Sequence, residues 1–152
     1  MRLFGNIEAK TDAKGRVFLP ATFRKVLQAS GEESLVIRTD LSEQCLVLYP
    51  ESVWNQRMDE LFARAEDFDD DERLVVRQYV AQAEMVTLDG NGRFLIPKRM
   101  MQAAGIGQSV RFLGMNNTIE IWSAERTEQT FLPKEEFKAR IRAMMKKEPD
   151  ER

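Results

Sequence analysis

The stretch Asp12-Ala13-Lys14-Gly15-Arg16-Val17-Phe18-Leu19-Pro20 has a second copy, Asp89-Gly90-Asn91-Gly92-Arg93-Phe94-Leu95-Ile96-Pro97. Asp, Gly, Arg and Pro hold the same four places in both copies, and three apolar residues precede each Pro. A single repeat at this distance predicts two half-domains that face each other. Each copy is expected to form a tight loop, then a short strand buried on both faces, then a helix with Pro in its first turn.

The loop residues have two kinds of expected role. Gly15 and Gly92 are expected to supply a positive φ, so that the chain reverses tightly before each arginine. Asp12 and Asp89 are interpreted as loop-structuring residues, because Asp at the start of a turn accepts backbone N–H groups two residues on.

Arg16 and Arg93 fit two roles that the spacing alone leaves open. Each arginine could form an ion pair within its loop or with the other half. A guanidinium on a tight loop or short β-hairpin can also enter the major groove and hold guanine O6 and N7 together. Neighbouring cations would then hold phosphates, which position a protein without reading the sequence. The candidates for such contacts are Lys10, Lys14, Lys98 and Arg99.

The composition excludes several classes of site. Among the 152 residues there is no His, which removes the commonest general base and the commonest metal ligand. The one cysteine, Cys45, lies in an apolar run and is interpreted as a core residue. We therefore expect no enzyme activity, no metal, no cofactor and no small-molecule substrate. No apolar run approaches the roughly 18 residues of a membrane span, and no signal peptide is recognised.

Charge is segregated along the chain, although the net charge is only −2. Residues 1–30 carry six basic and two acidic side chains, whereas residues 32–72 carry thirteen acidic and three basic ones. Such segregation can give a mildly acidic protein one basic face. The alternative is that surface charges clump without a functional reason.

The pattern of apolar residues predicts four segments: a first half at 1–50, a helical insert at 51–83, a second half at 84–123, and a C-terminal helix and tail at 124–152. Each half is expected to run in the order loop, buried strand, Pro, helix, Gly, strand, turn, strand. The acidic run Asp69–Glu72 is interpreted as a helix start, because it lacks the oxygen spacing and Gly of a calcium loop. The expected buried stripe of the helix that follows is Val75, Val76, Tyr79, Val80 and Ala83.

The terminal helix is expected to carry Phe137, Ile141, Met144 and Met145 on one face and basic side chains on the other. A basic amphipathic helix can lie on a membrane. The apolar face is narrow and lacks Trp, which favours packing on the body of its own chain or on a neighbouring subunit. The apolar faces of the helices expected within 50–83 and 132–145 both need cover, and some of it is expected from neighbouring subunits, so a homo-oligomer is predicted.

Both copies of the motif, with Phe4-Gly5 before the first and with Gly114 and Ile119-Glu120-Ile121-Trp122 after the second, resemble the MraZ family from about Arg2 to Trp122. The resemblance implies an α+β fold related to AbrB and SpoVT, a pseudo-twofold double-split β-barrel of swapped hairpins made from the two halves. It also implies ring-like oligomers in the bacterial cytoplasm, associated with the nucleoid.

The function implied is that of a transcriptional regulator, which binds repeated double-stranded DNA sites upstream of the division and cell-wall gene cluster. Arg16 and Arg93 fall on the motif arginines. The second loop has Asn91 where the first has Lys14, so it is less basic and is expected to bind DNA less strongly.

Two other classes stay open. The first is the DNA-binding antitoxin of a toxin–antitoxin pair, although such proteins usually carry one hairpin copy and a disordered toxin-binding tail. The second is an RNA-binding protein, because a basic loop does not by itself distinguish RNA from DNA.

Overall fold

The computed structural model describes residues 1–65 and 69–149. The first half contains β1 (Leu3–Lys10), β2 (Arg16–Phe18), α1 (Ala21–Ala29), β3 (Leu35–Thr39) and β4 (Leu46–Pro50). The insert contains α2 (Glu51–Arg64) and α3 (Asp70–Ala81). The second half contains β5 (Glu84–Val86), β6 (Arg93–Leu95), α4 (Lys98–Ala103), β7 (Ser109–Asn116) and β8 (Ile119–Ser123). The helices α5 (Ala124–Thr130) and α6 (Lys134–Met145) follow. The fold is α+β, as predicted.

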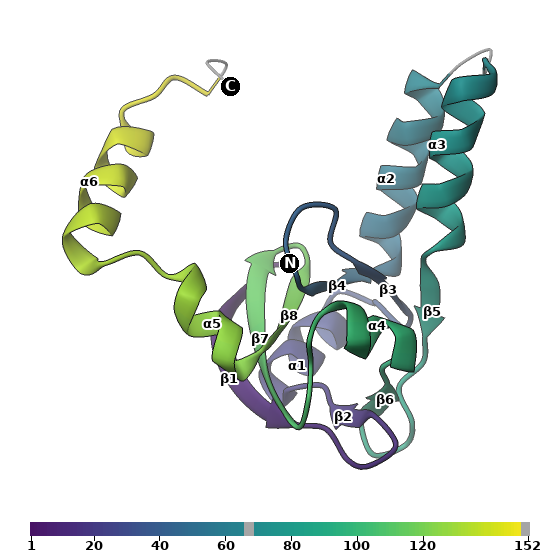
Figure 1. Ribbon diagram of the computed structural model, residues 1–152, viewed down its shortest axis with the longest axis horizontal. Coiled ribbons are helices and arrows are strands. Elements are labelled where there is room, and N and C mark those ends of the chain that lie inside the picture. Colours follow the sequence, from purple (N-terminus) through teal and green to yellow (C-terminus); the bar gives the residue numbers. More distant parts are fainter. Residues whose placement is uncertain (66–68, 150–152) are drawn as a thin grey trace.

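Strands from the two halves are interleaved (Figure 1). The larger sheet is antiparallel and has the order β1-β7-β8-β4-β3-β5, while β2 and β6 pair only with each other in a two-stranded ribbon. The first strand of each half pairs with a strand of the other half, β1 with β7 and β5 with β3. The remaining contacts between the halves, β2 with β6 and β4 with β8, join equivalent strands. Each half therefore completes the sheet of the other.

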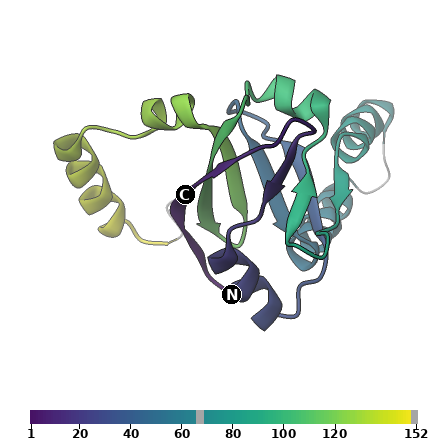
Figure 2. The same cartoon turned by 90° about the horizontal axis from the view of Figure 1, so that it is seen from below.

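The larger of two apolar clusters lies between the sheet, the ribbon and the helices α1 and α4, whose arrangement Figure 2 shows. The ribbon contributes Val17 and Phe94, and the ring of Phe94 meets Phe112 of β7 edge-on with centroids 6.4 Å apart. Cys45 is buried, as predicted, and burial raises the pKa of its thiol. Both halves supply residues to this core, so neither half buries its apolar strands alone.

The expected burial of the ribbon strands on both faces was wrong. Val17, Leu19, Phe94 and Ile96 are buried, but Phe18 and Leu95 are 53% and 56% exposed. The physical reason is that β2 and β6 form a separate ribbon, of which only one face meets the core. Side chains alternate along each strand, so the middle apolar residue of each run points outward.

The helices begin one residue later than expected. Four helices have a proline as N-cap, with ψ between 137° and 148°: Pro20, Pro50, Pro97 and Pro133. Each proline is still extended, so its helix starts at the next residue. Asp69 caps α3 through a side-chain oxygen that accepts the N–H of Glu72 at 2.7 Å, which agrees with the interpretation of the acidic run.

The helices α2 and α3 form a hairpin that projects from one side of the body (Figure 1). A second apolar cluster anchors the base of the hairpin to the outer face of β3 and β4. Within it the rings of Trp54 and Tyr79 stack with centroids 5.7 Å apart. Val76 is buried as expected, but Val75 is 65% exposed, because the stripe of α3 that faces α2 is narrower than predicted.

The helix α5 packs against β7 and β8, and α6 projects beyond it, on the side of the body opposite the hairpin (Figures 1 and 2). Helix α5 was not predicted from the sequence, and Ser123 caps it by accepting the N–H of Arg126 at 3.1 Å. The terminal helix forms as predicted, but every residue of α6 is exposed. The expected alternative that it packs on the body of its own chain is therefore wrong for the residues that the structure describes.

Candidate nucleic-acid interface

One carboxylate organises the first loop. Oδ1 of Asp12 accepts the backbone N–H groups of Lys14 and Arg16, each at 2.9 Å, and Oδ2 accepts Nε–H of Arg16 at 2.7 Å. The amide of Gly15 donates to the carbonyl oxygen of Asp12 at 3.0 Å, and Gly15 has a φ of 89°. Asp12 therefore fixes both the backbone of the loop and the direction of the arginine side chain.

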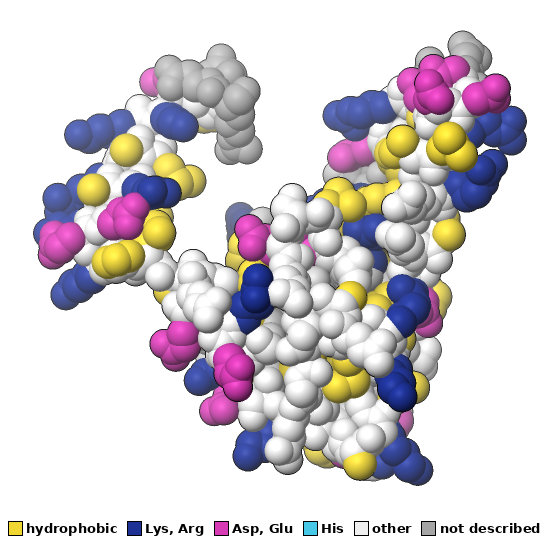
Figure 3. All heavy atoms as spheres, viewed as in Figure 1, with side chains coloured by type: hydrophobic (Ala, Val, Ile, Leu, Met, Phe, Trp, Pro, Cys, Tyr) yellow, Lys and Arg dark blue, Asp and Glu magenta, His cyan; other side chains and the backbone are white. Residues whose placement is uncertain are grey.

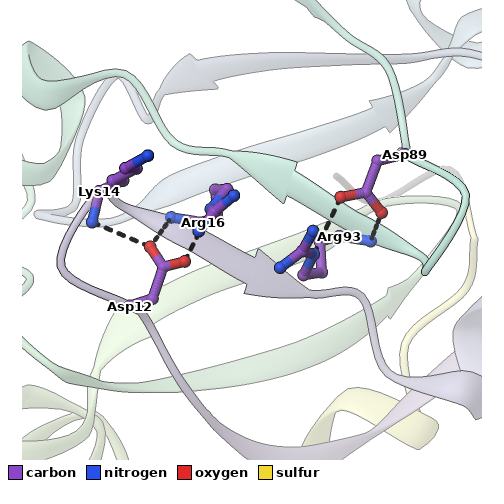
Figure 4. A network of polar contacts seen from close by, with 5 residues as sticks. All are labelled: Asp12, Lys14, Arg16, Asp89 and Arg93. Atoms are coloured by element: carbon purple, nitrogen blue, oxygen red, sulfur yellow. Dashed lines mark hydrogen bonds and ion pairs between the residues drawn. The ribbon is translucent and has the colours of Figure 1, made fainter.

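The second loop repeats this arrangement (Figure 4). Oδ1 of Asp89 accepts the N–H groups of Asn91 and Arg93, each at 2.9 Å, and Oδ2 accepts Nε–H of Arg93 at 2.9 Å. Gly92 has a φ of 82°, and its amide donates to the carbonyl oxygen of Asp89 at 3.0 Å. The two motif copies therefore form matching loops, in which each arginine is in an ion pair with its own aspartate.

These bonds change the proton affinity of both aspartates. The backbone N–H of Arg16 is the main cause that lowers the pKa of Asp12 from its ordinary value of 3.8, and the Arg16 side chain and the N–H of Lys14 act in the same direction. The N–H of Arg93 lowers the pKa of Asp89 in the same way. Both loops therefore keep a charged carboxylate at neutral pH.

The arginines lie on the outer face of the β2–β6 ribbon. In the antiparallel register Arg16 is opposite Leu95, and Phe18 is opposite Arg93. Directly opposite residues, and residues two apart along a strand, share one face, so these four side chains form a diagonal pattern of two arginines and two apolar groups. The Arg93 guanidinium lies 5.9 Å from the centroid of the Phe18 ring. The Arg16 and Arg93 side chains are 38% and 27% exposed.

The other predicted site residues are less uniform. Lys10 ends β1, Lys14 lies in the first loop and Lys98 begins α4, and all three are exposed. Arg99 instead forms an ion pair with Glu84 at 2.6 Å and donates to the backbone oxygen of Gln82 at 3.2 Å. Its charge is therefore partly matched within the chain.

Comparisons with known proteins identify the family. A family model described as "MraZ protein, putative antitoxin-like" matches residues 3–78 and 80–146. A "Transcriptional regulator MraZ" of Bacteroides fragilis is 51% identical over 148 residues, which cover 97% of this chain and 94% of the relative. The protein of that name from Phocaeicola vulgatus is 52% identical over 145 residues, covering 95% and 94% of the two chains, and one from Christiangramia forsetii is 35% identical over 133 residues, covering 86% and 83%.

The chain belongs to the MraZ family. Its relatives are named as transcriptional regulators of bacteria, so it is a member of a bacterial family of transcriptional regulators. The resemblance inferred from the doubled motif is thereby confirmed.

Beside the loops of this family member lies a basic residue that the sequence analysis did not assign. Nε–H of Arg24 donates to the carbonyl oxygen of Leu19 at 2.9 Å, and a Cβ atom placed on Gly92 would stand only 2.5 Å from Arg24 Nη1. Arg24 belongs to the first half but flanks the loop of the second half.

Each loop lies beside side chains of the other half because its backbone is hydrogen-bonded to that half. The amide of Leu19 donates to the carbonyl oxygen of Gly92, and the amide of Ile96 donates to that of Gly15, each at 3.0 Å. The residue equivalent to Arg24 is Met101, whose Sδ would stand 3.2 Å from a Cβ on Gly15. The first loop thus carries Lys14 and adjoins a methionine, while the second carries Asn91 and adjoins an arginine. Each loop therefore has one basic group besides its motif arginine.

In residues 1–65 and 69–149, no cluster of three or more His, Cys, Asp and Glu residues is placed to hold a metal ion. Over the same residues, no helix combines the length and the apolar character needed to cross a membrane.

Proposed function

We propose that this chain is a transcriptional regulator that reads guanine in the major groove of duplex DNA with Arg16 and Arg93. The observation that carries the proposal is the doubled Asp–Arg loop on the outer face of the β2–β6 ribbon. In each copy the aspartate holds Nε of the arginine, and within the described chain the two terminal nitrogens have no hydrogen-bond partner. Those nitrogens form a fork that fits guanine O6 and N7.

The ion pairs support recognition because they fix the guanidinium before DNA arrives. An arginine that is already oriented loses less side-chain entropy on binding. The major groove, about 12 Å wide, admits a two-stranded ribbon, so both arginines of one chain can face base edges together. Phe18 and Leu95, exposed beside them, are suited to apolar contact with thymine methyl groups.

The surrounding cations supply affinity for phosphate in this proposal. Lys10, Lys14, Lys98 and Arg24 are the candidates, with Arg99 contributing less because Glu84 is its ion-pair partner. Phosphate contacts position the protein and make its binding depend on salt. The second loop has Asn91 where the first has Lys14, and Arg24 supplies the positive charge that this position lacks. The second loop therefore also has a basic group beside its motif arginine, which was not expected from the sequence.

The finer features implied by the family are part of the same proposal. The matched pairings β1–β7 and β5–β3 support an AbrB-like barrel of swapped hairpins, with the divisions 1–50, 51–83, 84–123 and 124–152. One ribbon buries too little surface for tight specific binding, so a ring-like homo-oligomer would gain affinity through avidity on repeated sites. The proposed sites lie upstream of the division and cell-wall gene cluster, and the proposed location is the nucleoid in the cytoplasm.

Footprinting of the purified protein on DNA upstream of its own gene tests this function. The expected result is protection of several evenly spaced short repeats, lost when their guanines are replaced. Uniform, sequence-independent protection, or equal affinity for RNA of the same sequence, would contradict it.

The antitoxin alternative has one specific observation in its favour, the words "antitoxin-like" in the description of the matching family model. Affinity purification of the protein from its native cells distinguishes the two functions. A stoichiometric small toxin in the eluate would establish the antitoxin, and its absence while the protein still binds operator DNA would support the regulator.

A further inference from the structure

The helix α6 carries an apolar stripe with no partner within the described chain. Its four residues lie at i, i+4, i+7 and i+8, on one face of the helix. They are Phe137, 54% exposed, Ile141, 42%, Met144, 65%, and Met145, 81%. Lys138 and Arg142 flank one side of this stripe, and Arg140 flanks the other. From Lys134 to Lys147 there are six basic and two acidic side chains. Basic side chains therefore border the apolar stripe of α6 on both sides.

The hairpin of α2 and α3 has a complementary surface near its tip. A hollow of about 300 Å³ lies between the two helices, with Leu61, Ala65, Val75 and Val76 in its wall. Asp71 and Glu72 lie at its rim, together with Arg64. Figure 3 shows acidic side chains gathered at the end of the hairpin above apolar ones. Among the described residues from Asp59 to Glu72, six are acidic and one is basic.

We propose that α6 of one copy docks its apolar stripe into the hollow between α2 and α3 of a second copy of this chain. In this arrangement the apolar stripe of α6 contacts the apolar residues of the hollow, and the basic side chains beside the stripe face Asp71 and Glu72. Burial of apolar surface and charge attraction therefore favour the same orientation. This inference rests on the homo-oligomer in the proposed function and names the surfaces that build it.

The geometry selects a second copy over the same chain. The hairpin and α6 project from opposite sides of the body and lie well apart in both views (Figures 1 and 2). Two different surfaces on opposite sides make a head-to-tail contact, which leaves each copy with one donor helix and one acceptor hollow. Repetition of such a contact closes into a ring when the rotation between neighbours permits.

The experiment uses two complementary variants of the full chain. Ile141→Asp disrupts the donor stripe, and Val75→Asp disrupts the acceptor hollow. Ala139→Asp, on the opposite face of α6, is the matched control. All three positions are exposed, so circular dichroism should match wild type. Light scattering should give several times 17.6 kDa for wild type and the control, and 17.6 kDa for each disrupted variant.

Mixing the two disrupted variants gives the decisive result. Each then has one intact surface, so they should combine one to one into a species of about twice 17.6 kDa and go no further. A self-pairing contact of α6 with α6 would instead leave Val75→Asp fully assembled, and would overturn the proposal. An unchanged mass for Ile141→Asp would overturn it as well.

Charge-reversal variants test the same contact between α6 and the hairpin without changing its apolar residues. Lys138→Glu with Arg142→Glu should lower the mass, and adding Asp71→Lys with Glu72→Lys to the same chain should restore it. Vesicles of phosphatidylglycerol test the competing occupant. If Ile141→Asp abolishes vesicle binding while the mass stays that of wild type, α6 is a membrane-binding helix and the docking proposal is wrong.

The failure of this inference can be distinguished from failure of the proposed function. Ile141→Asp should still bind a single DNA repeat as a monomer while losing the gain from several repeats. Arg16→Ala should lose binding to the DNA repeat while keeping the oligomer mass of wild type. An oligomer that forms as described but ignores operator DNA would retain the docking and refute the DNA-binding function alone.

Discussion

Arg24 of the first half lies against Gly92 of the second, close enough that a Cβ on Gly92 would stand 2.5 Å from Arg24 Nη1. A basic side chain of one half thus flanks the arginine loop of the other. The equivalent position in the second half is Met101, which lies against Gly15. The two loops have the same backbone but differ in which half supplies their second cation.

The first prediction concerns Arg24. Arg24→Met, which copies Met101, should weaken binding to every DNA sequence alike and reduce the slope of log K against log salt by about 0.9, because one phosphate contact is lost. Fluorescence anisotropy at three or more salt concentrations measures the slope. Arg73→Met, on the hairpin, is the control that removes a charge outside the loops. A slope equal to that of wild type would show that Arg24 is only a packing residue.

The second prediction concerns the backbone of the second loop. Gly92→Ala should cost roughly 1–2 kcal/mol in the free energy of unfolding, because a residue with a Cβ is strained at a positive φ. Gly90→Ala, in the same loop, should be nearly neutral, since its φ is ordinary and no atom lies within 4 Å of the new Cβ. Urea unfolding of the two variants provides the comparison. Equal stabilities would mean that the loop relaxes without strain.

The third prediction separates reading of bases from attraction of charge. Lys14→Ala should weaken all duplexes alike, whereas Arg16→Ala should cost roughly 1–3 kcal/mol on the cognate repeat and less on scrambled DNA. Arg16→Lys keeps the charge but lacks the fork and the Nε that Asp12 holds, so it should restore non-specific binding better than specific binding. Binding isotherms on both duplexes measure this. Wild-type affinity of Arg16→Ala for the repeat would place the DNA contact elsewhere.

The fourth prediction concerns pH. The folded pKa values of Asp12 and Asp89 are lowered below 3.8, so each charged carboxylate adds stability that is fully present above pH 3.8. That stability is lost as the pH falls from 3.8 through the lowered folded pKa. The double variant Asp12→Asn with Asp89→Asn should therefore lose less stability than wild type over this acid range. Thermal unfolding between pH 2 and 7 measures it, and parallel curves would contradict the prediction.

The fifth prediction concerns the apolar groups between the arginines. Phe18→Ser should leave the fold intact, because the side chain is 53% exposed, and should lower affinity for repeats that contain thymine beside guanine. The loss should be smaller than that of Arg16→Ala and should vanish on duplexes with uracil in place of thymine. Equal losses on thymine and uracil duplexes would exclude a contact with the methyl group.

Much of the loop geometry could be predicted from the sequence because its interactions are local. Asp12 reaches backbone groups two and four residues on, and Gly15 adopts the conformation that its lack of a Cβ permits, so nine consecutive residues contain the whole arrangement. Helix and strand positions followed from periodicity for the same reason. The helix α5 was missed because its seven residues carry no apolar stripe.

The sequence by itself determined the two matching arginine loops and the α+β order of each half, because these depend on neighbours along the chain. The tertiary structure alone decided which strands pair between the halves. The pairing of β2 with β6 turns Phe18 and Leu95 outward, and the bond from Leu19 to Gly92 brings Arg24 to the loop of the other half. It also decided that every residue of α6 is exposed, with no cover from the parts of the chain that the structure describes. An apolar stripe shows that a helix needs a partner, but only the arrangement of the elements in space shows whether that partner lies in the same molecule.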